Sequence, residues 1–226
     1  NNYIDGGEAG TTDSDTVDYS FLTGVNFADD TNNVAYYKNG IYYNGIKVDL
    51  TETAAPQRIH VSYGSDTILN IENVIGSTKN DYIVGSNENN ILDGKGGDDY
   101  FVLGQGVDTI LGDGGSDTIA FTETTRTAGV NVDLGKNQTY GSPDSYRVVN
   151  DGFGKAKYLD SIENIIGTTY SDIIFGNNDA NKLFGGAGND TLKGGLGSNV
   201  LDGGIGQDWA YFDDIVVSGV NIVLDT

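Results

Sequence analysis

The sequence has no cysteine, one histidine and only two prolines among its 226 residues. Without cysteine, neither a disulfide nor a thiolate–metal site can form. The single histidine, His60, argues against a zinc site, which is built on imidazole and thiolate ligands. The scarcity of proline beside 34 glycines argues against collagen and against a proline-rich linker. The chain therefore needs many tight turns and has no covalent cross-link to stabilise them.

Basic residues are also scarce, with 12 Lys and Arg against 33 Asp and Glu, which gives a formal charge of -21. A compact body with this charge repels itself unless something neutralises it. The charge therefore argues against nucleic acid and anionic membranes as partners and favours cations. No apolar run is long enough to cross a bilayer, so membrane insertion is not expected. A hydrophobic fraction of 37% is enough to bury a core.

Glycine and aspartate recur together with a period of nine residues. The best preserved stretch, from Gly185 to Asp208, reads GGAGNDTLK, GGLGSNVLD, GGIGQD. Residues 67–120 and 158–211 each hold about five such nonads behind a leading phrase, IENVI or IENII. Position six is Asp or Asn in the nonads, and Glu72 or Glu163 in the leading phrase. Position eight is apolar throughout: Ile83, Leu92, Phe101, Ile110, Ile119, Ile174, Leu183, Leu192, Leu201 and Ala210. This regularity indicates an array of duplicated modules.

The period predicts an all-β fold, a right-handed parallel β-roll. Each nonad splits into a turn of about six residues and a strand of about three. Two nonads make one turn of the roll, so nonads two apart stack on one edge and position eight builds an apolar spine. Asn39-Gly40 and Asn44-Gly45 predict antiparallel hairpins with strands near 34–38, 41–43 and 46–50.

The pattern also predicts a division of the chain. The expected parts are 1–18 as the terminal rung of a preceding block, 19–66 as a Tyr-rich hairpin insertion, 67–120 as the first roll block, 121–157 as a second β insertion, 158–211 as the second roll block and 212–226 as the start of a further insertion. We therefore expect a monomeric segment of a longer repetitive protein.

The turn chemistry predicts calcium. Early glycines adopt backbone conformations that a Cβ forbids and turn carbonyls towards a common point, where the position-six Asp adds a carboxylate. Such an oxygen cage suits Ca²⁺, whereas Mg²⁺ demands waters and rigid octahedral geometry. Calcium is expected to bridge Asp81 with Asp99 and Asp99 with Asp117 along one edge, with Asn90 and Asp108 on the other. We expect roughly four ions per block, about eight in all, and folding coupled to binding.

The two blocks resemble the repeats-in-toxin (RTX) family, whose hemolysin-type nonapeptide repeats occur in large secreted bacterial adhesins and surface proteins. The nonads, the IENVIG phrase and the recurring GVNVDL strand carry the resemblance. It implies type I secretion in an unfolded state, an extracellular or cell-surface location, and calcium bound by position-six side chains and by carbonyls of the first four positions. The candidate ligands are then Asp81, Asn90, Gly94, Gly96, Asp99, Gly104, Gly106, Asp108, Gly112, Gly114, Asp117, Asp172, Asn181, Gly185, Gly186, Ala187, Gly188, Asp190, Gly194, Gly195, Leu196, Gly197, Asn199, Gly203, Gly204, Ile205, Gly206 and Asp208.

Several position-six residues depart from the family pattern. Asparagine at three of these positions predicts weaker sites with a neutral acceptor. Asp81 and Asp172 lie in nonads without paired glycines, which predicts half-sites. Glu72 and Glu163 are either ligands of a cap site or structural, and the sequence favours neither. The strongest bridge is expected between Asp190 and Asp208.

No catalytic motif accompanies the repeats. There is no Gly-x-Ser-x-Gly elbow, and His60 is expected to be a surface residue. The prediction is a non-enzymatic calcium-binding adhesin or surface module, with an RTX module of an enzyme or toxin as one alternative. The other alternative is glycan or protein binding by aromatic side chains, which could equally cover the roll: Tyr36, Tyr37, Tyr42, Tyr43, Tyr63, Tyr140 and Tyr146. Trp209 is expected to pack against the insertion that follows it.

Overall fold

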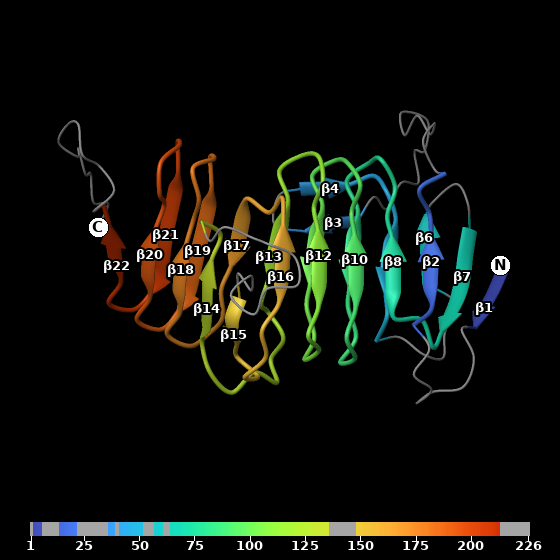
Figure 1. Cartoon of the computed structure of the whole chain (residues 1–226), viewed down its shortest axis with the longest axis horizontal. Coiled ribbons are helices and arrows are strands. Elements are labelled where there is room, and N and C mark those ends of the chain that lie inside the picture. Colours follow the sequence, from blue (N-terminus) through green and yellow to red (C-terminus); the bar gives the residue numbers. More distant parts are fainter. Residues whose placement is uncertain are drawn as a thin grey trace.

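The computed structural model describes residues 2–5, 14–21, 36–38, 41–51, 57–60, 64–135 and 148–212. The described residues form short strands that stand side by side along the long axis of the molecule (Figure 1). They include no helix, and so none that could cross a membrane. The predicted all-β class is confirmed.

One parallel sheet of seven strands runs through both repeat blocks. Its strands, in spatial order, are β5 (Lys47–Asp49), β9 (Tyr82–Val84), β11 (Tyr100–Val102), β13 (Thr118–Ala120), β17 (Asn164–Ile166), β19 (Lys182–Ala187) and β21 (Val200–Ile205). Within a block, neighbouring strands of this sheet are two nonads apart in sequence, as Ile83, Phe101 and Ile119 are in the register. This pairing confirms that two nonads make one turn of the roll.

The alternate strands of each block form the opposing sheets. In the first half these are β2 (Thr16–Asp18), β8 (Asn73–Ile75), β10 (Ile91–Asp93), β12 (Thr109–Leu111) and β16 (Tyr158–Asp160). In the second half they are β15 (Val148–Asp151), β14 (Val130–Asp133), β18 (Ile173–Phe175), β20 (Thr191–Lys193) and β22 (Trp209–Tyr211). The second insertion thus supplies the strands at the junction between the blocks.

The position-eight side chains form the core between the sheets, as the spine argument predicts. Ile83, Phe101 and Ile119 on one sheet and Leu92 and Ile110 on the other are all fully buried. The spine loosens only in the last nonads, where Leu201 is half-buried and Ala210 is exposed.

The hairpin predictions are only partly right. β3 (Tyr36–Lys38) and β4 (Ile41–Tyr43) pair antiparallel as expected. The third strand, β5, instead pairs parallel with β9 and belongs to the roll. The residues just before β5 are hydrogen-bonded to the first nonad, because Gly45 N donates to Asn80 O at 2.7 Å. A Cβ at Gly45 would overlap the Asp81 carboxylate, so this glycine serves docking and not a hairpin turn.

The remaining strands form a small mixed sheet. β7 (Gly64–Leu69) pairs parallel with β1 (Asn2–Asp5) and antiparallel with β6 (Gln57–His60). The insertion strand β14 pairs parallel with β18, as β5 does with β9, so the recurring strand motif has the same place in both blocks. The division of the chain into blocks and insertions stays a prediction.

Candidate metal centre

The position-six residues form hydrogen-bonded ladders along the edges of the roll. The backbone N–H of Asp81 donates to Asp99 Oδ1 at 2.8 Å, and that of Asp99 donates to Asp117 Oδ1 at 2.8 Å. In the second block Asp190 N donates in the same way to Asp208 Oδ1 at 2.9 Å. One carboxylate oxygen of each rung therefore holds the neighbouring turn, and the other is left for a different partner.

That other oxygen has no hydrogen-bond donor at three rungs. Oδ2 of Asp99, of Asp117 and of Asp190 is buried and unpartnered. A buried charge without a partner costs free energy, and carboxylates in such places gain protons instead. Burial raises the pKa of Asp99 to about 10, with Asp81 adding repulsion, and burial raises the pKa of Asp117 to about 7. A bound cation would remove this cost, so these three oxygens fit calcium.

The glycines of the turns keep the space around these oxygens free of side chains. Gly94 lies against Asp99 Oδ2, and a Cβ at Gly94 would overlap that oxygen. Gly186 has a φ of 109°, in the left-handed region, and a Cβ there would overlap the Thr168 carbonyl oxygen of the turn below. Glycine therefore lets neighbouring turns stack closely and leaves room beside the carboxylates.

Side chains alone do not make a metal site in the part of the chain that the structure describes. There, no group of three or more His, Cys, Asp or Glu side chains comes together. An ion in these turns would draw on one or two carboxylates and complete its shell with backbone carbonyls. That donor set is all oxygen, which suits calcium and not zinc.

The leading glutamates are rungs of the same ladders. Asp15 N donates to Glu72 Oε2 at 3.0 Å, and Asp117 N donates to Glu163 Oε2 at 2.9 Å. Each glutamate thus takes the place that an aspartate holds elsewhere in the ladder. Of the two roles left open by the sequence, this geometry supports the structural one directly.

Asp81 and Asp172, predicted as half-sites, have donors on both carboxylate oxygens. Ser77 N donates to Asp81 Oδ2 at 2.6 Å, and Ile46 N donates to Asp81 Oδ1 at 2.7 Å. Asp172 is held in the same way by Thr168 and Val130. These aspartates begin the ladders, because the insertion strand supplies the donor that a preceding rung would otherwise supply.

The three asparagines act as donors and not only as neutral acceptors. Nδ2 of Asn90 donates to Glu72 O at 2.7 Å, and Nδ2 of Asn181 donates to Glu163 O at 2.9 Å. Nδ2 of Asn199 donates to the carbonyl of Leu196, within its own turn, at 2.8 Å. These amides satisfy carbonyls without a metal, a role that the sequence prediction of weak calcium sites did not include.

The turn at Asp108 holds a lysine ammonium. Gly104, Gly106 and Asp108 were predicted calcium ligands, but in the structure Lys157 Nζ donates to all three. The structure thus gives these predicted ligands a partner other than calcium. The nine-residue pattern carries no signal for it, because Lys157 lies in the second insertion, far from the turn in sequence.

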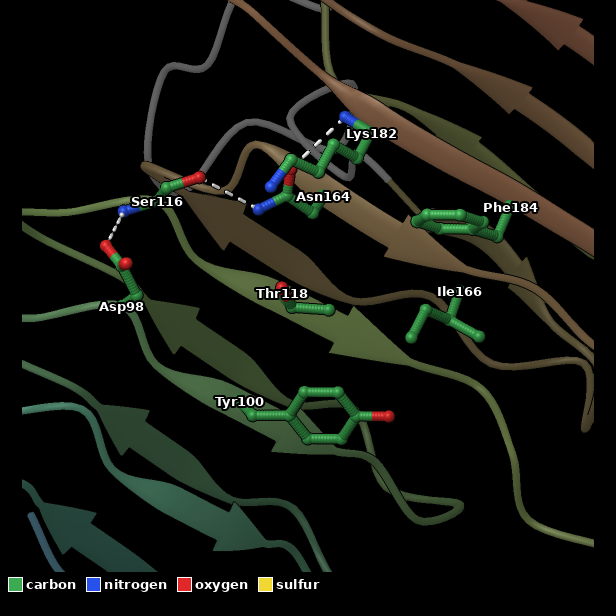
Figure 2. Close-up of a pocket in the computed structure, with 8 residues that line it drawn as sticks. All are labelled: Asp98, Tyr100, Ser116, Thr118, Asn164, Ile166, Lys182 and Phe184. Atoms are coloured by element: carbon green, nitrogen blue, oxygen red, sulfur yellow. Dashed lines mark hydrogen bonds between the residues drawn. The ribbon is translucent and has the colours of Figure 1, made fainter. Parts of the chain in front are cut away.

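A pocket lies on the outer face of the seven-stranded sheet (Figure 2). Its walls come from β11, β13, β17 and β19: Asp98, Tyr100, Ser116, Thr118, Asn164, Ile166, Lys182 and Phe184. Tyr100 stacks on Tyr82 with ring centroids 5.4 Å apart, and both rings are buried. The tyrosine side chains of the insertions and the environment predicted for His60 lie outside the described side chains. Trp209 was predicted to contact the insertion that follows it, and all of that insertion except Phe212 lies outside the described residues.

A known repeat family matches this part of the chain. The family model of the RTX calcium-binding nonapeptide repeat matches four copies, at residues 71–101, 85–119, 160–192 and 175–210. These residues contain all five nonads of each block except for the last residue of each block. No curated protein matches the chain.

Proposed function

The two repeat blocks of this chain belong to the RTX family of calcium-binding nonapeptide repeats, and on this premise we propose that the chain is a structural module of a large secreted bacterial surface protein or adhesin. RTX repeats bind calcium and form a β-roll. The proposed module leaves the cell unfolded by type I secretion and folds on extracellular calcium. It is a monomeric segment of a longer chain, it acts by rigidity and spacing, and it has no catalytic role.

The observation that carries this proposal is the set of buried, unpartnered Oδ2 atoms of Asp99, Asp117 and Asp190. These three carboxylates would hold the ions together with carbonyls of the stacked turns. Bound calcium would neutralise them and cross-link neighbouring turns of the roll. We propose ions at these three rungs, fewer than the eight or so that the repeat count predicts, because six other position-six side chains already have a partner for their second polar atom: Asp81, Asn90, Asp108, Asp172, Asn181 and Asn199.

Circular dichroism tests the proposal most directly. In EGTA the chain is expected to lose β signal from the calcium rungs and to unfold at a lower temperature, and excess Ca²⁺ should reverse both changes, whereas Mg²⁺ should not. Binding energy here is folding energy, since the metal site does not exist in the unfolded chain. An unchanged β spectrum across these conditions would contradict the proposal.

The pocket beside Tyr100 supports a second candidate function, ligand binding by an adhesin. It has aromatic residues on its two outermost strands, Tyr100 on β11 and Phe184 on β19, and polar groups at one end, where Asn164 Nδ2 donates to Ser116 Oγ at 3.0 Å (Figure 2). Aromatic faces flanked by hydrogen-bonding groups are typical of small-ligand sites. A glycan array on the calcium-loaded chain tests it: specific binding that Phe184→Ala abolishes would favour a ligand-binding module over a pure scaffold.

A further inference from the structure

The side chain of Lys157 is fully buried and enclosed by oxygen atoms. Its Nζ donates to Gly104 O at 2.9 Å, Gly106 O at 2.7 Å and Asp108 Oδ2 at 2.8 Å, and it forms an ion pair with Asp151 Oδ2 at 2.9 Å. An ammonium has three hydrogens, and here all three are used. Carbonyls of a glycine turn with a position-six carboxylate are the donor set that would hold calcium elsewhere in the roll.

A second buried cation completes the occupation of this turn. Arg126 Nη2 donates to Leu103 O, the first carbonyl of the same nonad, at 2.6 Å. The guanidinium also lies over two aromatic rings, 5.1 Å from the centroid of Phe121 and 4.5 Å from that of Phe153. The carbonyls of positions one, two and four and the position-six carboxylate therefore all have cationic donors.

The insertion that supplies Lys157 is itself anchored to the roll. Lys157 N donates to Val148 O at 3.0 Å, which joins the lysine to β15, and Tyr158 N donates to Asp108 O at 2.9 Å. The Asp151 carboxylate is fixed by a tight turn, because its Oδ1 accepts from Lys155 N at 2.9 Å. The ammonium is thus held at the turn by backbone pairing on both sides.

We propose that Lys157 is a built-in counter-ion that permanently fills one calcium position of the roll. The junction between the two blocks then needs no metal at this turn and can form before calcium binds at the acidic rungs. The inference rests on the proposed function, in which calcium binds at the acidic rungs and not at this turn. Removing the ammonium should expose two carboxylates, Asp108 and Asp151, and two carbonyls to a divalent cation.

Two substitutions of one residue separate a counter-ion from an ordinary buried ion pair. Lys157→Ala removes the charge and leaves room for an ion, whereas Lys157→Met removes the charge and keeps the bulk. Equilibrium dialysis against Ca²⁺, with the bound metal measured by mass spectrometry, should give one more ion per chain for Lys157→Ala than for the wild type. Lys157→Met should bind the wild-type number. An Ala variant with the wild-type number of ions would overturn the proposal.

Two aspartate variants test the proposal if the lysine variants do not fold. Asp108→Asn, with Lys157 intact, should leave the number of bound ions unchanged, whereas Asp190→Asn should lower it by one. Loss of an ion from Asp108→Asn would show calcium at this turn and overturn the inference. A wild-type chain that binds no calcium would instead contradict the proposed function, so the two failures are distinguishable.

Discussion

The turns at Asp99 and Asp108 share one nine-residue pattern and differ in how their charge is balanced. Both aspartates are buried, and one oxygen of each accepts from the neighbouring rung, Asp81 N or Asn90 N. The other oxygen has no donor at Asp99 but binds the Lys157 ammonium at Asp108. The need for a metal is therefore set by what the surrounding elements supply and cannot be inferred from the nonad alone.

Asn199 shows a third solution to the same problem. It holds the position of the second block that Asp108 holds in the first, and its amide donates to the Leu196 carbonyl of its own turn. The roll can therefore combine carboxylate, ammonium and amide rungs, with the calcium requirement concentrated at the carboxylate rungs. The predictions below test whether that uneven distribution holds.

Calcium removal should have the largest effect, and it should be uneven. Hydrogen exchange is expected to accelerate about 100-fold or more in β11 and β20, since an ion present at 100 times its Kd contributes ~2.7 kcal/mol. The strands β12 and β16, beside Lys157, should keep more of their protection because their turn has its own cation. Equal loss of protection in all four strands would erase the contrast between the two kinds of turn.

Gly186→Ala should be the next largest effect. Its φ of 109° costs an L-residue ~1–2 kcal/mol, and the overlap of the new Cβ with the Thr168 carbonyl should add ~1–3 kcal/mol. Urea unfolding of the calcium-loaded chain measures the change in the free energy of unfolding. Gly154→Ala is the matched control, because Gly154 also has positive φ, 79°, but a Cβ there meets nothing within 4 Å. Similar losses for both variants would mean that turn stacking imposes no steric limit.

The repeat period was enough to predict most of the fold. A period of nine with an apolar position eight fixes strand length, stacking of nonads two apart and the buried side chains, because each of these follows from local pattern and pleat. The prediction of a third antiparallel strand was wrong because Asn44-Gly45 carries a strong hairpin signal. Docking of Gly45 and Ile46 on the Asp81 turn overrides that local preference, and such a long-range contact leaves no mark in the sequence nearby.

The sequence predicts which residue types form the candidate site, but it does not predict which of their oxygens already have a hydrogen-bond donor. Position six identifies the ladder residues, and among them the structure singles out Asp99, Asp117 and Asp190 by their unpartnered oxygens. Whether the second oxygen is free depends on its donor, which is Ser77 N of the same nonad at Asp81 and Lys157 of the second insertion at Asp108. The lysine has no repeat to align it with its turn.

The effect of Asp99→Asn on stability should change sign when calcium is added. In the metal-free chain the variant removes a buried, unpartnered carboxylate oxygen, which should stabilise the fold by ~1–3 kcal/mol. In excess calcium the same variant should be less stable than the wild type, because it loses a charged ligand. Thermal unfolding with EGTA and with Ca²⁺ measures both. Glu88→Gln, an equal charge change on an exposed side chain, should change neither midpoint appreciably.

The smallest expected effect is the change in stability of the metal-free chain between pH 7 and 8. Burial raises the pKa of Asp99 to about 10 and those of Asp81 and Asp117 to about 7, so the folded chain holds protons that the unfolded chain has released. Stability should therefore be greatest below the unfolded pKa, near pH 4, and should fall as pH rises. Between pH 7 and 8 Asp99 keeps its extra proton while Asp81 and Asp117 release what remains of theirs, which gives a loss of about 2 kcal/mol.

The control for this slope is again Asp99→Asn, measured on chain stripped of metal by a chelating resin so that no pH-dependent chelator is present. The variant lacks the titrating group, so its stability between pH 7 and 8 should change much less than that of the wild type. In calcium the trend should reverse, since protons compete with the ion for the same carboxylates and affinity rises with pH. A metal-free wild type that gains stability from pH 5 to 8 would mean that Asp99 is ionised in the folded chain. Its turn would then have a cation of its own, as the turn at Asp108 does.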